Sequence, residues 1–133
     1  MGEDIDNKFF ALFHLSLAKE IYKSFPNCYN EKLSEIGKEI GLRLVDNFCA
    51  ENDISEAIKN DEIENYIKLF FQMYFKKKID IQNGMIHLNE VFEEYLGIEI
   101  FIAILNEVFK PLNTKINFYK SQDGVICFTI CEF

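Results

Sequence analysis

Apolar residues between Asn30 and Phe48 recur every three or four positions, the pattern of an amphipathic helix. They are Leu33, Ile36, Ile40, Leu44, Val45 and Phe48. Gly37 and Gly41 lie on the same face. Because each glycine within a helix costs about 0.5–1 kcal/mol relative to alanine, two of them one turn apart require a reason. The spacing predicts that another backbone, of the same chain or of a partner, passes too close for a Cβ atom.

A second helical pattern covers residues 8–25 and is expected to stop before Pro26, because the residue before a proline disfavours the α conformation. Its apolar residues cover more than half of the helix circumference, which is typical of a helix that is buried on more than one side. In a small domain one of those sides can belong to a partner. The polar residues 1–7 are predicted to be frayed.

Polar breaks separate the glycine-containing helix from its neighbours. We expect this helix to begin at Asn30 as its N-cap and to end near Cys49. Helical spacing of isoleucine, tyrosine and phenylalanine then predicts a further helix over residues 63–75. Asn60 or Asp61 is the expected cap of that helix.

Strand-like alternation appears twice later in the chain. Asn83–Gly84 separates the alternating segments 79–82 and 85–88. An Asn-Gly pair at such a place predicts a two-residue hairpin, because a type I′ turn needs positive φ at both central residues. A second hairpin is predicted over residues 115–133, with its turn at 121–124.

Between the hairpins, residues 90–110 form a long helical pattern that ends before Pro111. Its middle is apolar nearly all round, so we expect it to be the central buried helix, with Gly97 as a point of close approach or a local break. Helices and antiparallel hairpins that alternate in this way predict an α+β fold of about four main helices packed with a small sheet. We expect a single domain over residues 1–133.

Composition narrows the classes of function. The chain has 133 residues, of which 49% are hydrophobic, and 14 of them are phenylalanine, so it can form a sizeable core and still offer apolar surface to a partner. A formal net charge of −8 argues against nucleic-acid binding and against simple adhesion to anionic lipid. No apolar run reaches the length of a membrane span, and the acidic N-terminus is unlike a signal peptide.

Candidate catalytic or metal-binding groups are scarce. The sequence has no phosphate-binding glycine loop and no motif of a metalloprotease or serine hydrolase. The four cysteines (Cys28, Cys49, Cys127 and Cys131) lack CxxC spacing, and only His14 and His87 could join them. Reduced thiols are therefore expected, and no cofactor, metal or catalytic residue is predicted.

The glycine-containing helix resembles the Gly-x-x-x-Gly-x-Arg-Leu-[Ile/Val]-[Asp/Glu] signature of the small core subunits of TRAPP, the transport protein particle. Residues 37–46 read Gly-Lys-Glu-Ile-Gly-Leu-Arg-Leu-Val-Asp. The predicted order of helices and hairpins is also similar to that family across nearly the whole chain. Residues 101–108, which lead into 116–120, are most similar to the subtype known as the thirty-one-kilodalton subunit.

This resemblance implies a cytoplasmic, non-catalytic subunit of a complex that tethers vesicles between the endoplasmic reticulum and the Golgi apparatus. The complex also promotes nucleotide exchange on a Rab-type GTPase and is peripheral at those membranes. Such subunits pair with paralogous subunits, as homo- or heterodimers, through their first two helices. The residues that would be shared between the core and this interface are Phe9, Phe10, Phe13, Leu17, Ile36, Gly37, Ile40, Gly41 and Leu44.

The chain also departs from the family. One TRAPP subtype carries an acylated cysteine in the loop after the second helix, whereas residues 50–55 have none here, and the nearest thiol, Cys49, lies at the end of the helix. This departure argues against lipidation. The alternative function is a small-molecule or lipid sensor, because vinyl-reductase-like ligand-binding domains are similar in pattern and use Cys or His late in the chain. Cys127 and Cys131, on one face of the last strand, keep that alternative open.

Overall fold

The computed structural model of the chain describes residues 16, 19–76, 78–88, 98–122 and 124–131. Its helices are α2 (Tyr29–Glu51), α3 (Ile63–Phe70), the π-helical η1 (Phe71–Phe75) and α4 (Ile98–Phe109), and residues 19–24 are also helical. The strands are β1 (Ile79–Gln82), β2 (Met85–Leu88), β3 (Ile116–Lys120) and β4 (Ile126–Ile130). The predicted α+β class is confirmed. None of the helices in these ranges is long and apolar enough to cross a membrane.

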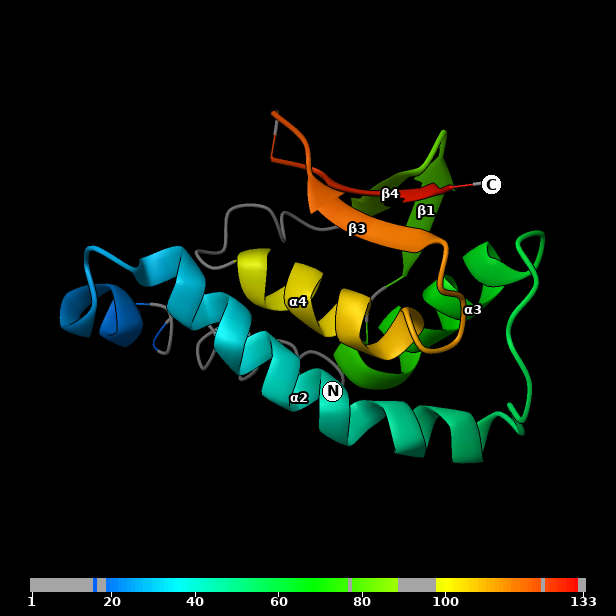
Figure 1. Cartoon of the computed structure of the whole chain (residues 1–133). Coiled ribbons are helices and arrows are strands. Elements are labelled where there is room, and N and C mark those ends of the chain that lie inside the picture. Colours follow the sequence, from blue (N-terminus) through cyan, green and yellow to red (C-terminus); the bar gives the residue numbers. More distant parts are fainter. Residues whose placement is uncertain (1–15, 17–18, 77, 89–97, 123, 132–133) are drawn as a thin grey trace, which may run out of the picture.

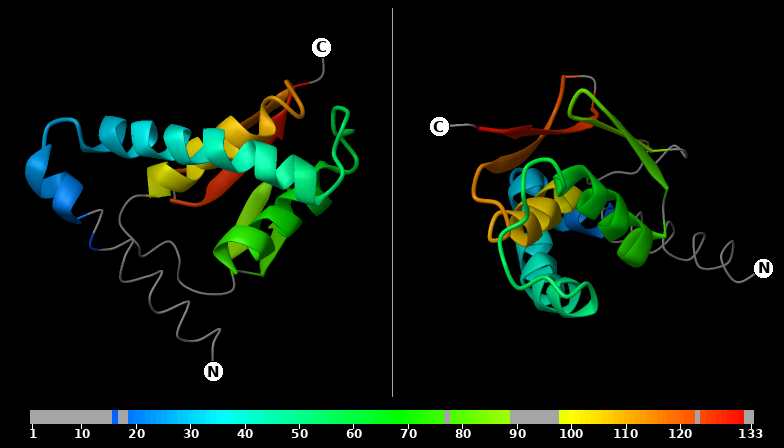
Figure 2. Two further views of the ribbon diagram at one scale, coloured as in Figure 1. Left: turned by 90° about the horizontal axis from the view of Figure 1, so that it is seen from below. Right: turned by 90° about the vertical axis from the view of Figure 1, so that its right-hand side faces the viewer.

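The helix α4 lies between the sheet and α2 (Figure 1), and the sheet stays on one side of the helices when the molecule is turned (Figure 2). Eight of its twelve residues are buried: Ile98, Ile100, Phe101, Ala103, Ile104, Leu105, Val108 and Phe109. The prediction of a central buried helix is therefore confirmed for residues 98–109. Its expected start at residue 90, and Gly97, lie outside the described residues.

The four strands form one antiparallel sheet in the order β1-β2-β4-β3. Both predicted hairpins are confirmed, and Asn83 and Gly84 have φ angles of 53° and 74°, as a type I′ turn requires. Gly84 also joins the two hairpins, because its carbonyl accepts a hydrogen bond from the N–H of Phe128 at 2.8 Å. A Cβ atom on Gly84 would lie 2.7 Å from the carbonyl oxygen of Phe128, so this turn packs directly on β4.

A cluster of aromatic rings joins the three main helices. Phe48 of α2, Phe70 of α3 and Phe109 of α4 are fully buried, and their ring centroids lie 5.4–5.8 Å apart in edge-to-face arrangements. Each such pair contributes about 0.5–1.5 kcal/mol beyond the burial of its area. The phenylalanine content of the sequence is thus used largely for the core.

The two glycines of α2 make the close contact that their spacing predicts, and the neighbour is α4 of the same chain. A Cβ atom on Gly37 would lie 2.5 Å from the carbonyl oxygen of Ile100 and 2.6 Å from the Cβ of Ala103. A Cβ on Gly41 would lie 2.6 Å from the Cβ of Glu107. Since real Cβ atoms do not approach other atoms so closely, α2 and α4 can adopt this separation only with glycine at both positions.

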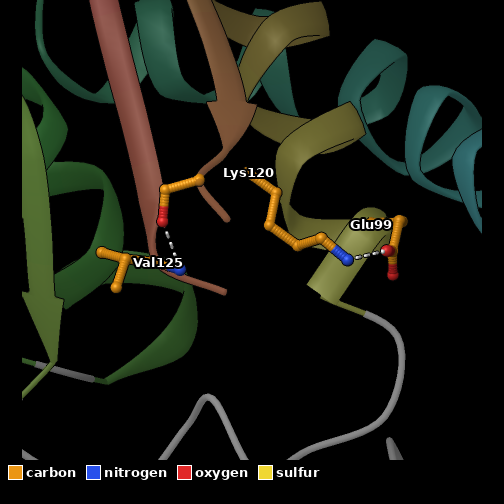
Figure 3. Close-up of polar contacts among 4 residues, drawn as sticks. Glu99, Lys120 and Val125 are labelled. Carbon is orange, nitrogen blue, oxygen red and sulfur yellow. Dashed lines mark hydrogen bonds and ion pairs between the residues drawn. The ribbon is translucent and has the colours of Figure 1, made fainter. Parts of the chain in front are cut away.

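Polar side chains tie β3 to α4. The amide of Asn106 donates to the carbonyl of Phe118 at 2.9 Å and accepts from its N–H at 2.8 Å, as a neighbouring strand would do. At the end of β3, Lys120 forms a 2.9 Å ion pair with Glu99 at the start of α4 (Figure 3). The edge of the sheet at β3 is therefore closed by a helix.

A second asparagine fixes the long loop between α2 and α3. The side chain of Asn113, which is 6% exposed, donates to the carbonyl of Ile58 at 3.2 Å and to Asn60 Oδ1 at 2.8 Å. It also accepts from the N–H of Lys115, and Ile58 N–H donates to the Leu112 carbonyl. This asparagine thereby links two segments that are more than 50 residues apart in the sequence.

Two expected N-caps are wrong. The helix α2 begins at Tyr29 with Cys28 as N-cap, instead of Asn30, and it ends at Glu51, close to the expected Cys49. The N-cap of α3 is Glu62, without a side-chain hydrogen bond, and Asn60 instead accepts a hydrogen bond from Asn113. The predicted helical range 63–75 is confirmed, with residues 71–75 as a π-helical turn.

We predict that Gly37→Ala destabilises the protein, although alanine favours the helix by about 1 kcal/mol. The added methyl group meets the backbone of Ile100, and overpacking of this kind costs about 1–3 kcal/mol, so the net effect is a lower free energy of unfolding. Urea denaturation measures it. The control is Lys38→Ala, on the exposed side of the same helix. A Gly37 variant more stable than wild type would show that the two helices separate at this point without penalty.

Asn113→Ala should lower the free energy of unfolding by about 1–3 kcal/mol, because it removes the donor to the Ile58 carbonyl and the acceptor for the Lys115 N–H. Asn117→Ala is the matched control, since Asn117 is exposed on β3, and it should change stability by no more than about 0.5 kcal/mol. Equal effects of the two substitutions, measured by denaturation, would contradict the role of Asn113 in the core.

Candidate partner interface

The structure describes five of the nine residues predicted for a partner interface, and all five lie in α2. Ile36, Ile40 and Leu44 are half-buried, whereas Gly37 and Gly41 are buried. The other four, Phe9, Phe10, Phe13 and Leu17, lie outside the described residues. So does His14.

The five α2 residues divide between two neighbouring sides of the helix. Gly37 and Gly41 contact α4, so the close neighbour left open by the sequence belongs to the same chain. Ile36 and Ile40 instead line a surface groove of about 420 Å³, together with Glu35, Glu39 and Arg43. Ile36, Ile40 and Leu44 all pack at the margin of the core, and Leu44 is not among the described residues that line the groove. Ile36 and Ile40 therefore remain candidates for the partner interface, whereas Gly37 and Gly41 contact α4 of the same chain.

Charged side chains flank the apolar floor of this groove. Glu35, Glu39 and Arg43 follow one another at intervals of one helical turn beside Ile36 and Ile40. Glu35 also forms an ion pair with Lys32, whose Nζ lies 3.4 Å from the Glu35 carboxylate. Arg43, the single arginine of the sequence, makes no ion pair with any described carboxylate. The groove can thus accept an apolar ridge and offers both signs of charge at its rim.

A second exposed apolar region, which the sequence pattern did not single out, lies where the helical residues 19–24 lead into α2. Tyr22 and Phe25 are 59% and 44% exposed, and Lys32 Nζ lies 5.0 Å from the centroid of the Phe25 ring. Tyr22 also contacts Tyr29 edge to face. Both exposed rings belong to a helix that looked broadly apolar, so periodicity alone could not separate them from its buried residues.

A thiol at the end of α2 and a phenol of the neighbouring η1 both have raised pKa values. Burial, followed by the nearby carboxylate of Asp46, raises the pKa of the Cys49 thiol. Burial and the carboxylate of Glu51 likewise raise the pKa of Tyr74, whose hydroxyl donates to the side chain of Asn47. A raised thiol pKa lowers the fraction of the reactive thiolate, so Cys49 is in a poor position to act as a nucleophile.

The late cysteines do not form a site together. Cys127 is 4% exposed on β4, with its Sγ 3.7 Å from the carbonyl of Val125, whereas Cys131 is exposed and follows the end of the strand. Within the described ranges no three His, Cys, Asp or Glu side chains are grouped so that they could hold a metal ion.

A profile of the transport protein particle (TRAPP) component family matches residues 10–126. No curated protein matches the sequence significantly. The matched range includes every described helix and reaches into β4, and it contains the α2 contact with α4 and the neighbouring groove. Since the profile covers most of the sequence, the chain belongs to the TRAPP component family, whose members are subunits of a vesicle-transport complex.

Proposed function

We propose that the protein is a non-catalytic subunit of a TRAPP-like complex that tethers vesicles between the endoplasmic reticulum and the Golgi apparatus. In that assembly it contributes to a platform for nucleotide exchange on a Rab-type GTPase, most like the thirty-one-kilodalton type of subunit. The observation that carries the proposal is the family match over residues 10–126, which spans the whole helical layer. The protein would act in the cytoplasm and reach membranes only through the complex.

The groove beside Ile36 and Ile40 supports a role in assembly. These two isoleucines are only half-buried, so a partner that covers them removes further apolar area from water, at about 25 cal/mol for each Å². Arg43 at the rim has no carboxylate partner among the described residues, and a carboxylate from another subunit would satisfy it. We propose a paralogous subunit as the partner, in a homo- or heterodimer.

The choice between an assembly subunit and a small-molecule sensor can be made by recovering the protein from its native cells. An assembly subunit brings down several small paralogous subunits in stoichiometric amounts. A sensor elutes alone and shows the additional mass of a ligand in native mass spectrometry. Recovery of the lone protein would overturn the proposed function.

The substitution Ile40→Glu should reduce the recovery of paralogous subunits by about tenfold or more, because it places a charge in the apolar floor of the groove. Leu42→Glu is the matched control, since Leu42 lies on another side of α2 and is 52% exposed. Thermal unfolding of both variants checks that each is folded. If Leu42→Glu and Ile40→Glu lose partners to the same extent, the groove is not the interface.

Cys49 should react with iodoacetamide more slowly than Cys131 at neutral pH, because its pKa is raised and it is half-buried, whereas Cys131 is exposed. A raised pKa also means that the rate at Cys49 keeps increasing with pH above the range in which an ordinary thiol is already ionised. Peptide mass spectrometry of time points measures both rates. A faster reaction at Cys49 would reopen the question of acylation at this position.

A further inference from the structure

The two edges of the sheet differ. At β3, the outward backbone groups of Phe118 are both taken by the side chain of Asn106, and the N–H of Ile116 donates to the Asn113 carbonyl at 3.2 Å. The opposite edge is β1. An edge strand with unpaired backbone groups is a template for another strand. Within the described ranges, side-chain and loop groups bind the β3 edge and none binds the β1 edge.

The register of the first hairpin shows which groups of β1 face outward. In a two-residue hairpin, Gln82 and Met85 form a hydrogen-bonded pair, and so do Asp80 and His87. The N–H and C=O groups of Ile79 and Ile81 therefore point away from β2. Among the residues that the structure describes, neither isoleucine makes a further backbone or side-chain hydrogen bond at that edge.

The side chains along β1 alternate in character. Ile79 and Ile81 are half-buried on the core side, in line with the buried Ile86 of β2. Lys78, directly before the strand, and Asp80 are exposed on the other side. An additional strand would supply hydrogen bonds to the outward groups and would cover the isoleucines.

We propose that β1 is a self-association edge, at which a second copy of this chain adds its own β1 in antiparallel orientation around Ile79. Charge selects this register. With Ile79 opposite Ile79 of the second copy, Lys78 of each copy faces Asp80 of the other, which gives two opposite-charge pairs. A register centred on Asp80 would place two aspartates opposite one another, and one centred on Ile81 would leave both charges without a partner. Ile79 would exchange both of its outward hydrogen bonds with its symmetry mate.

This association goes beyond the proposed function, since it uses the sheet edge and not the helical groove. The ladder is short, because η1 and its C-cap Lys76 come just before β1, so in this register only residues 78–80 of the two copies lie opposite one another. We therefore expect a weak, concentration-dependent dimer. At about 0.15 M salt the Debye length is about 8 Å. Salt therefore screens most of the long-range repulsion between two copies, each with a net charge of −8. The cross-strand pairs of Lys78 and Asp80 would be separated by less than a Debye length, so salt screens their attraction less.

Sedimentation velocity of the full chain over a concentration series, with charge-reversal variants, tests the proposal. Lys78→Asp and Asp80→Lys should each weaken self-association about tenfold, because each change converts both symmetry-related pairs into like-charge contacts. The double variant restores both pairs in the opposite sense and should return to within about threefold of wild type. Asn117→Lys, on β3 at the opposite edge of the sheet, is the control for an added charge.

Two further measurements keep folding separate from association. Ile79→Pro removes an outward N–H at the first position of an edge strand, where proline is tolerated, and it also shortens a side chain that packs at the margin of the core. The variant should therefore fold with a lower melting temperature, which thermal unfolding measures, and remain monomeric. In the wild type, hydrogen exchange at the Ile79 amide should slow with rising protein concentration. A wild-type chain that stays monomeric at its highest soluble concentration overturns the proposal, and so does self-association that is unchanged in both single charge variants.

The remaining outcomes distinguish this proposal from the proposed function. If Ile40→Glu abolishes self-association and Lys78→Asp does not, the helical groove mediates it, and the β1 proposal fails while the proposed function stands. If the isolated chain is monomeric but Ile79→Pro loses a paralogous subunit from the native complex, the edge accepts a strand of another subunit, and a second copy is excluded as the occupant.

Discussion

The direct packing of α2 on α4 at Gly37 and Gly41 is the contact on which the other layers depend. Neither position carries a side chain, and a Cβ atom there would collide with α4. The two helices can therefore approach closely, so that α2 covers one side of α4. The opposite side of α4 then meets β3, and its end brings Phe109 against Phe48 and Phe70. Each glycine weakens α2 as an isolated helix by about 0.5–1 kcal/mol, and burial of the layered core offsets that loss.

Two asparagines connect the helical core to the sheet and to the loop between α2 and α3 by hydrogen bonds. Asn106 supplies from α4 the hydrogen bonds that a fifth strand would make to β3, and Asn113 fastens the 53–62 loop to the turn before β3. Both bind backbone groups that would otherwise be unpaired, so the loop and one sheet edge are held without strands of their own. Among the residues that the structure describes, no such side chain binds the other edge, β1, and this asymmetry makes the two edges chemically different.

The helix α2 has a buried side and a half-buried side next to each other. The side with Gly37 and Gly41 is covered by α4, and the side with Ile36 and Ile40 lines the groove that charged side chains flank. A shift of one residue along the sequence is enough to change what a side chain contacts, because successive positions rotate by about 100° around the helix. The signature over residues 37–46 therefore combines Gly37 and Gly41, which contact α4, with Arg43, which lines the groove. Burial, and not the motif, separates the two groups.

The sequence by itself determined the order of the elements, both hairpins and the buried nature of α4, since periodicity and the Asn-Gly turn are local signals. It also showed that Gly37 and Gly41 needed a close neighbour, and the signature around Arg43 indicated the family. Only the tertiary structure decided that this neighbour is α4 of the same chain, because contacts between segments 60 residues apart leave no local trace. For the same reason the roles of Asn106 and Asn113, the true cap of α3 and the open edge at β1 became visible only once the layers were assembled.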